Sequence, residues 1–207
     1  MNKIGAWTRR YFAGGGFTLI ELLIALLITA VLAAAAFQFY ITMQQQVVTQ
    51  QEISDMQQIS RSCLQEMGKA VRMAGYMAHT LPPGTPAWDT SGTTLTINMG
   101  CDDPTCPGIV HYVRFFLQEY TEDDYAKVPF RPDGMSIYKL MKETDASIGP
   151  EVYADGIVSI TYTPIGTSEM AITLEVQTSK GDESFDQNSG FRTFVNTERV
   201  TMRNVTL

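Results

Sequence analysis

The sequence lacks the side chains and motifs from which most enzymes build an active site. It has only two histidines, His79 and His111, three cysteines and no CxxC pair. A histidine-based zinc site needs more ligands than these at suitable spacings. P-loop, GxGxxG and GxSxG motifs are also missing. The sequence therefore predicts a protein with no catalytic residues, no metal and no cofactor.

Cysteine is scarce, and its placement leaves one question open. Cys101 and Cys106 flank a short, turn-prone loop in the stretch CDDPTC, and they either form a disulfide or remain two free thiols. A disulfide would be permitted only if this part of the chain lies outside the cytoplasm. The third cysteine, Cys63, falls in a helical pattern and is expected to be a buried, unreactive thiol.

Basic residues are outnumbered, which argues against a nucleic-acid partner. The net charge is −7, from 15 basic and 22 acidic residues. Lys3, Arg9 and Arg10 all precede residue 16, so the chain after Gly16 carries 15 − 3 = 12 basic and 22 acidic residues, or −10. Nucleic-acid binding requires a basic face. Basic residues before a first apolar span keep that end in the cytoplasm and place the following chain outside.

Proline is absent from the first eighty residues, and a helical pattern runs without interruption from Phe17 to about Tyr76. Residues 17–40 are apolar on all sides, as in a helix surrounded by lipid or by other subunits. The second half has one apolar stripe, which predicts packing on the chain's own globular domain. The stripe comprises Ile53, Met56, Ser60, Cys63, Met67, Ala70 and Ala74.

The remainder of the chain has the pattern of β-strands. Apolar and polar residues alternate in several segments, and turns rich in Gly, Pro, Asp or Asn separate them, which favours an antiparallel sheet with one covered face. The expected strands are 94–99, 109–117, 135–141, 156–164, 169–179 and 191–202. The predicted fold class is therefore α+β, a long N-terminal helix whose second half packs on a mainly antiparallel sheet.

Glu21 is unexpected, because it stands at the start of a long apolar run. An acid at the centre of a membrane span costs about 2.5–3.5 kcal/mol, and less near the edge. The run is a signal anchor that tolerates one acid, a signal peptide cut near the alanines at 33–36, or a helix whose acid gains a partner through processing. No helix break follows the alanines, which disfavours the second explanation. A cut after Gly16 would give Phe17 a positively charged amine about one helical turn from Glu21.

The stretch GGGFTLIELLIALLI closely resembles the class III signal of type IV pilins and of type II secretion pseudopilins. The resemblance implies that a membrane-bound prepilin peptidase cuts between Gly16 and Phe17 and N-methylates Phe17. It also implies that Glu21 supports the docking of subunits. The implied domains are a leader (1–16), a long helix (17–77) with a transmembrane or filament-core half (17–40), and a β-rich head (78–207).

Two later segments are similar to minor pilins of the PilW type. These are MGKAVRMAGY at 67–76 and ERVTMRNVTL at 198–207, the second also similar to J-type pseudopilins. The resemblance implies a minor pilin that helps to initiate or cap a type IV pilus. Its partners would be the peptidase, other minor and major pilins and the inner membrane, before it moves to the cell-surface pilus. The alternatives are a J-like pseudopilin and a signal-anchored extracytoplasmic enzyme or binding protein.

Two acidic loops are candidate binding segments of lesser weight. GDESFDQNSG at 181–190 alternates oxygen-bearing side chains like the start of a calcium loop, but Gln187 and Thr193 stand where an EF-hand needs Gly and Glu. A solvated hairpin turn is the favoured interpretation. TEDDY at 121–125 is interpreted as an exposed loop, with a partner patch as the alternative.

Overall fold

The computed structural model describes residues 17–101, 110–120, 136–144, 149–178 and 190–204. The chain divides into two compact units, Met1–Val47 and Val48–Leu207. In its described part the first unit is helix, and the second unit combines the continuation of that helix with a β-sheet.

Helix α1 (Leu19–Arg72) supplies all the regular structure of the first unit. Every side chain from residue 17 to residue 47 is exposed. The hydroxyls of Thr29 and Thr42 donate to the carbonyl oxygens of Ala25 and Gln38, at 2.8 and 3.1 Å, so neither hydroxyl needs a water partner. By length and composition α1 can cross a membrane, and it is the one such helix among the described residues. The described residues of this unit leave the surface of its apolar half uncovered.

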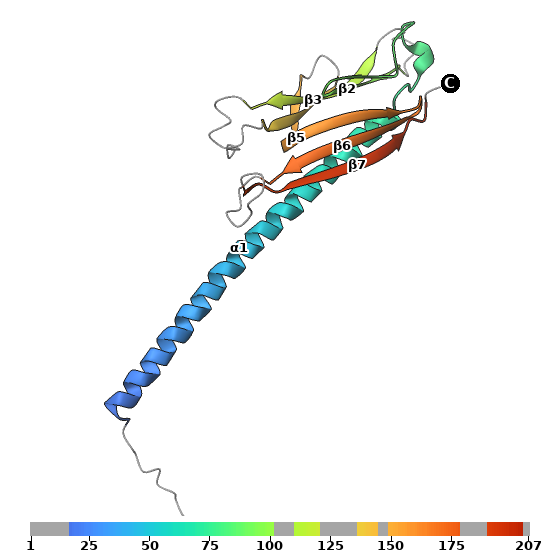
Figure 1. Cartoon of the computed structure of the whole chain (residues 1–207). Coiled ribbons are helices and arrows are strands. Elements are labelled where there is room, and N and C mark those ends of the chain that lie inside the picture. Colours follow the sequence, from blue (N-terminus) through green and yellow to red (C-terminus); the bar gives the residue numbers. More distant parts are fainter. Residues whose placement is uncertain (1–16, 102–109, 121–135, 145–148, 179–189, 205–207) are drawn as a thin grey trace, which may run out of the picture. The chain divides into compact units, whose positions relative to one another are not determined.

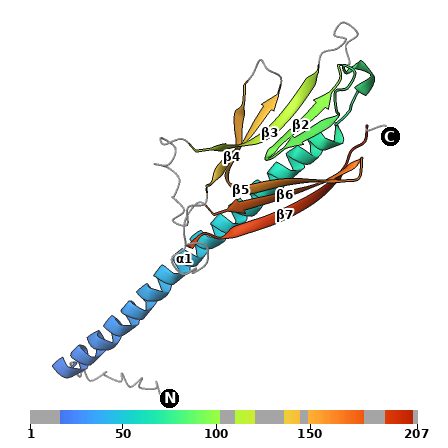
Figure 2. The ribbon, with the colours of Figure 1, turned by 45° about the horizontal axis from the view of Figure 1, so that its top comes forward.

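The second unit is built on a seven-stranded antiparallel sheet (Figures 1 and 2). The strands are β1 (Trp88–Ser91), β2 (Thr94–Met99), β3 (His111–Glu119), β4 (Tyr138–Thr144), β5 (Glu151–Ile165), β6 (Glu169–Gln177) and β7 (Thr193–Thr201). Each strand pairs with the next along the chain, so that β1 and β7 form the two edges. Register shifts interrupt the β4–β5 pairing and the β5–β6 pairing, whereas the β6–β7 pairing is regular over nine residue pairs.

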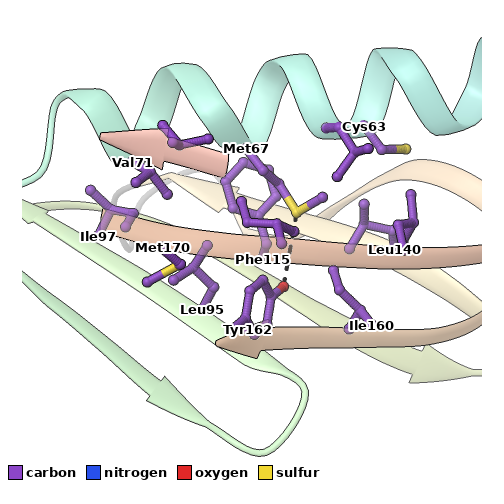
Figure 3. Packing of buried hydrophobic residues seen from close by; sticks show 14 of the residues in the cluster. Cys63, Met67, Val71, Leu95, Ile97, Phe115, Leu140, Ile160, Tyr162 and Met170 are labelled. Atoms are coloured by element: carbon purple, nitrogen blue, oxygen red, sulfur yellow. Dashed lines mark hydrogen bonds between the residues drawn. The ribbon is translucent and has the colours of Figure 1, made fainter. Parts of the chain in front are cut away.

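Residues 48–72 of α1 lie on one face of this sheet and close its core. The inner face of the helix buries Cys63, Met67 and Val71 against side chains from the strands (Figure 3). The Tyr162 hydroxyl of β5 donates to the Met67 sulfur at 3.9 Å. Burying one such apolar side chain contributes about 1.5–3 kcal/mol. The fully buried strand residues include Leu95, Ile97, Phe115, Leu140, Ile157, Met170, Ile172, Leu174 and Val176.

The structure confirms the predicted α+β fold class and the antiparallel sheet. Of the predicted helix stripe, Met56, Ser60, Cys63, Met67 and Ala74 are buried, and Ile53 and Ala70 are half-buried. Leu64, Gly68 and Val71 are also buried, so that the covered face is wider than the stripe. Strand β2 begins and ends as predicted, and the other five predicted strands overlap β3 to β7 with different ends.

The end of α1 and strand β1 differ from the sequence expectation. The α-helix ends at Arg72 rather than near Tyr76, and tight turns and a short 3-10 helix (Ala78–Thr80) follow. Gly75 has a φ of 69° and donates its N–H to the carbonyl of Asn98 at 3.1 Å, which diverts the backbone from the helix to β2. Strand β1 was not predicted, because WDTS is short and has no apolar alternation.

The turn after α1 is fixed by its contacts with the end of β2. Gly100 donates its N–H to the carbonyl of Tyr76 at 2.7 Å, and Cys101 donates to the Thr80 hydroxyl at 3.1 Å. A Cβ at Gly100 would overlap the Met77 carbonyl oxygen and the Thr80 hydroxyl, so only glycine fits here. The helix exit and the first strands are therefore one continuous, closely packed structure.

Candidate functional site

Of the residues predicted to direct processing and assembly, Glu21 lies in the first turn of α1 and Phe17 lies two residues before the helix. The helix begins at Leu19, directly after Thr18. The Glu21 carboxylate accepts hydrogen bonds from the backbone N–H and the hydroxyl of Thr18, each at 3.4 Å. In return, the Glu21 N–H donates to the Thr18 hydroxyl at 3.3 Å. Gly16 lies outside the described residues.

This reciprocal arrangement is a helix capping box. In a capping box, a Thr at the N-cap bonds the N–H of the third helical residue, and a Glu there bonds the N–H of the cap. The N-terminal end of a helix also favours a negative charge. Sequence reasoning missed this role, although the signal was present as Thr-x-x-Glu at residues 18–21. Glu21 therefore has a local partner before any processing occurs.

The surroundings of this turn are apolar and uncovered. Phe17 is 85% exposed, and Leu19 and Ile20 beside it are also exposed. Among the described residues, no Lys or Arg forms an ion pair with Glu21. In lipid, or between packed helices, the carboxylate would therefore retain an unneutralised charge, which is costly in an apolar medium. The capping box gives the carboxylate hydrogen-bond partners but does not neutralise its charge.

A polar seam fixes the second half of α1 on the sheet. Lys142 of β4 donates to the Glu66 carboxylate at 2.8 Å, and this hydrogen bond lowers the pKa of Glu66 below its usual value. One turn earlier, the Ser62 hydroxyl lies 3.2 Å from the hydroxyl of Tyr153 on β5. The Lys142 ammonium also lies 5.9 Å from the centre of the Tyr153 ring. These contacts define which side of the helix faces the sheet.

The three cysteines have different environments. Cys63 is a free thiol with 1% exposure, as expected, and burial raises its pKa to about 12. A thiol that stays protonated is a poor nucleophile. Cys101 is disulfide-bonded. Its expected partner Cys106 lies outside the described residues, so the Cys101–Cys106 pairing remains a prediction.

The structure brings together no second constellation among the residues that it describes. His79 is exposed in the 3-10 helix, whereas His111 opens β3. Within the described ranges, no three metal-ligating side chains form a group. The acidic loop at 121–125 and the calcium-like stretch at 181–190, except for Gly190, lie outside the described residues.

Comparison with known proteins identifies the N-terminal segment. Residues 14–37 match the family model described as the prokaryotic N-terminal methylation motif. No curated protein and no solved structure matches the chain significantly. The matched residues contain the capping box and the start of the uncovered apolar helix. The chain therefore carries a class III signal of the type IV pilin kind, which supports a place among pilins and pseudopilins and suggests a structural protein. A signal of this type also implies processing by prepilin peptidase, assembly with other pilins and membrane anchoring.

Proposed function

We propose that this chain, with the N-terminal signal of type IV pilins and pseudopilins, is a minor pilin that helps to initiate or cap a type IV pilus. Before assembly it would lie in the inner membrane with its N-terminus in the cytoplasm and its β-rich head outside. Prepilin peptidase would cut between Gly16 and Phe17 and methylate the new amine of Phe17. The processed chain would then enter the filament beside other pilins.

One observation carries this proposal: the processing signal leads directly into an apolar helical surface that the described residues of its unit leave uncovered. All side chains from residue 17 to residue 47 are exposed. The lateral packing of several such helices would cover that surface, as lipid does before assembly. The function would therefore be recognition between subunits, without catalysis.

Glu21 has a defined role in this proposal. Its carboxylate is held in the first turn by Thr18, next to the residue that would carry the new amine. The amine of one subunit and the carboxylate of its neighbour would neutralise each other between apolar helices. Because an unpaired ion is costly there, the pair would fix the axial register of the two helices.

The mature N-terminus provides the direct test. The full chain is produced with and without prepilin peptidase, and the N-terminal peptide is identified by mass spectrometry. A start at N-methylated Phe17 that depends on the peptidase supports the proposal. An intact leader, or a start near Ala35–Phe37, contradicts it.

A pair of substitutions separates the two roles of Glu21. Glu21→Gln keeps the capping box, because Gln also bonds the cap N–H, but it removes the charge. Glu21→Ala removes both. We expect both variants to insert into the membrane and to be cut, and both to enter filaments poorly. Normal incorporation of Glu21→Gln would show that the capping box, and not the charge, is what assembly needs.

A J-like pseudopilin of a type II secretion system shares the same signal. The central position of the close cysteine pair, with no cysteine in the last hundred residues, favours a minor over a major subunit. Deletion of the gene for this chain distinguishes a pilus subunit from a secretion-system subunit. Loss of surface pili with normal exoprotein secretion supports the pilus, and the reverse supports the secretion system. If the chain is instead a signal-anchored enzyme or binding protein, its deletion should impair neither the formation of pili nor exoprotein secretion.

A further inference from the structure

The two edges of the sheet differ in length and in protection. β1 is an edge of only four residues, whereas β7 is an edge of nine residues with no proline. Natural proteins usually avoid long open edges. They keep the edge strand short, or they place proline, a bulge or charged side chains in it. The β6–β7 pairing has no register shift, and the sole basic residue of β7 is Arg199. β7 is therefore a long, regular and weakly protected edge (Figures 1 and 2).

The hydrogen bonds at both ends of β7 show which of its backbone groups face outward. Thr178 donates its N–H to the Arg192 carbonyl at 2.9 Å, and Met202 donates to the Ser168 carbonyl at 2.8 Å. Both contacts continue the β6–β7 register by one residue pair at each end. In an antiparallel ladder, hydrogen-bonded and non-hydrogen-bonded pairs alternate. The even-numbered residues of β7 therefore bond β6, and the odd-numbered residues direct their N–H and C=O away from the sheet.

The same odd-numbered residues carry the exposed side chains of β7. Val195, Thr197, Arg199 and Thr201 are exposed, whereas Val200 is buried and Glu198 pairs with Arg72 of α1 at 3.4 Å. The side chains beside the free backbone groups are β-branched at three of these four positions, which suits a strand partner. No other backbone hydrogen bond to β7 residues 193–201 is present among the described residues.

We propose that the free edge of β7 accepts an extended segment of a different protein chain, which adds a strand to the sheet and places a carboxylate opposite Arg199. Addition of a strand to an open edge gains main-chain hydrogen bonds for affinity and uses alternate side chains for specificity. Arg199 is exposed and has no ion pair among the described residues. A facing acid would complete a cross-strand charge pair.

A second copy of the chain fits the edge less well. Antiparallel pairing of two β7 strands about Thr197 would use the odd-numbered residues of both, but it would place Arg199 opposite Val195 at each end. Both guanidinium groups would then remain unpaired. The unpaired Arg199 therefore favours a segment of another protein that has an acid at the facing position.

The test uses the purified full chain in detergent and a fluorescent nine-residue peptide. The peptide consists of threonines with Glu at its third position and Val at its seventh, which face Arg199 and Val195 in antiparallel pairing. A matched peptide has Lys in place of Glu. A third peptide keeps Glu but is N-methylated at positions 3, 5 and 7, which removes the backbone donors that would bond β7. Binding is measured by fluorescence anisotropy.

We expect the Glu peptide to bind and the N-methylated peptide not to bind. Arg199→Glu should weaken the Glu peptide by about five-fold and strengthen the Lys peptide by a similar factor. Thr197→Pro should abolish binding without loss of the fold, because the Thr197 N–H faces outward and does not bond β6. Thermal unfolding checks that this variant is folded. The N-methylated peptide tests the same backbone hydrogen bonds without any change to the protein.

Three results would overturn the proposal. The first is equal binding of the parent and N-methylated peptides, and the second is no response of either charged peptide to Arg199→Glu. The third is no peptide binding together with a dimer that Thr197→Pro dissociates, which would assign the edge to a second copy. The measurement does not require a cut at Gly16. The proposal about the edge of β7 therefore does not rest on the proposed function, and the two can fail separately.

Discussion

The two halves of α1 share one continuous backbone helix but differ in what surrounds their side chains. From residue 17 to residue 47 every side chain is exposed, whereas residues 48–72 bury Cys63, Leu64 and Met67 in the core of the second unit. Hydrogen bonds within the helix satisfy the backbone in both halves. The two halves therefore do not differ in helical structure. They differ in whether the chain's own sheet covers their apolar side chains.

The comparison shows how one helix can serve two purposes. Its second half uses apolar side chains to stabilise the head, and it adds polar contacts, such as Glu66 with Lys142, that fix its orientation. In its first half, the described part of the chain leaves the apolar side chains exposed. Substitutions in the two halves should consequently affect different measurements.

The largest effect is expected from a matched pair of leucine truncations. Leu64 is 2% exposed and Leu27 is 59% exposed on the same helix. Leu64→Ala should reduce the free energy of unfolding of the head by about 2–5 kcal/mol, because it leaves a cavity. Leu27→Ala should leave that free energy unchanged and weaken packing with other helices instead. Urea unfolding of the full chain in detergent measures the free energy of unfolding for both variants. An equal loss in the two variants would contradict the distinction between the halves.

Alkaline pH should affect the buried half through Cys63. The pKa of this thiol is raised from about 9 in the unfolded chain to about 12 in the folded chain. A raised folded pKa gives stability that is complete below about pH 9 and decreases as the pH rises towards 12. By pH 10 the loss should be about 1 kcal/mol. Urea midpoints between pH 8 and 10 should therefore fall more steeply for the natural chain than for Cys63→Ala. Parallel curves would contradict this prediction.

A capping substitution should affect the first half alone. Thr18→Ala removes the hydroxyl that bonds the Glu21 N–H and should destabilise the first helical turn by about 1 kcal/mol. Amide hydrogen exchange in micelles should become faster at the first turn. The urea midpoint of the head should stay the same, and a shift of this midpoint would mean that the halves are coupled.

The smallest effect is expected at the polar seam. Lys142→Met removes the ammonium at 2.8 Å from Glu66 and should cost about 0.5–1 kcal/mol at pH 7. The lowered pKa of Glu66 gives stability that is present above its unfolded pKa of about 4.5 and is lost as the pH falls through the lower folded value. The cost should therefore shrink at pH 3. Lys69→Met is the control, because the Lys69 side chain is 71% exposed, and an equal cost in both variants would contradict the prediction.

The sequence predicted the features that repeat along the chain. The 3-4 spacing of Met56, Ser60, Cys63 and Met67 identified the buried helix face, and alternating strands identified the sheet. The sequence did not predict β1, which has no alternation, or the end of α1, where the contact of Gly75 with Asn98 overrides the local helical pattern. It could not predict the pairing of Glu66 with Lys142, because these residues are 76 positions apart and their contact depends on how the helix lies on the sheet.

The candidate site was predictable to a similar degree. Glu21 was selected because an acid is costly in an apolar run, but its partner in the structure is Thr18, which the Thr-x-x-Glu spacing could have revealed. The outward direction of the β7 backbone could not be read from the sequence. Odd and even residues of a strand exchange roles when the register moves by one. The β6–β7 pairing, together with the bonds at Arg192 and Met202, shows which residues face outward.

The contact of α1 with the last strand has a consequence for biosynthesis. A Cβ on Gly68 would lie 3.4 Å from the Val200 side chain, and Arg72 pairs with Glu198. Arg72 and Glu198 lie 126 residues apart in the sequence, so the side of α1 that faces the sheet cannot complete its contacts until β7 has been synthesised. Until then that side of the helix lacks its final partners, and a chain truncated before residue 193 should therefore be degraded rather than accumulate.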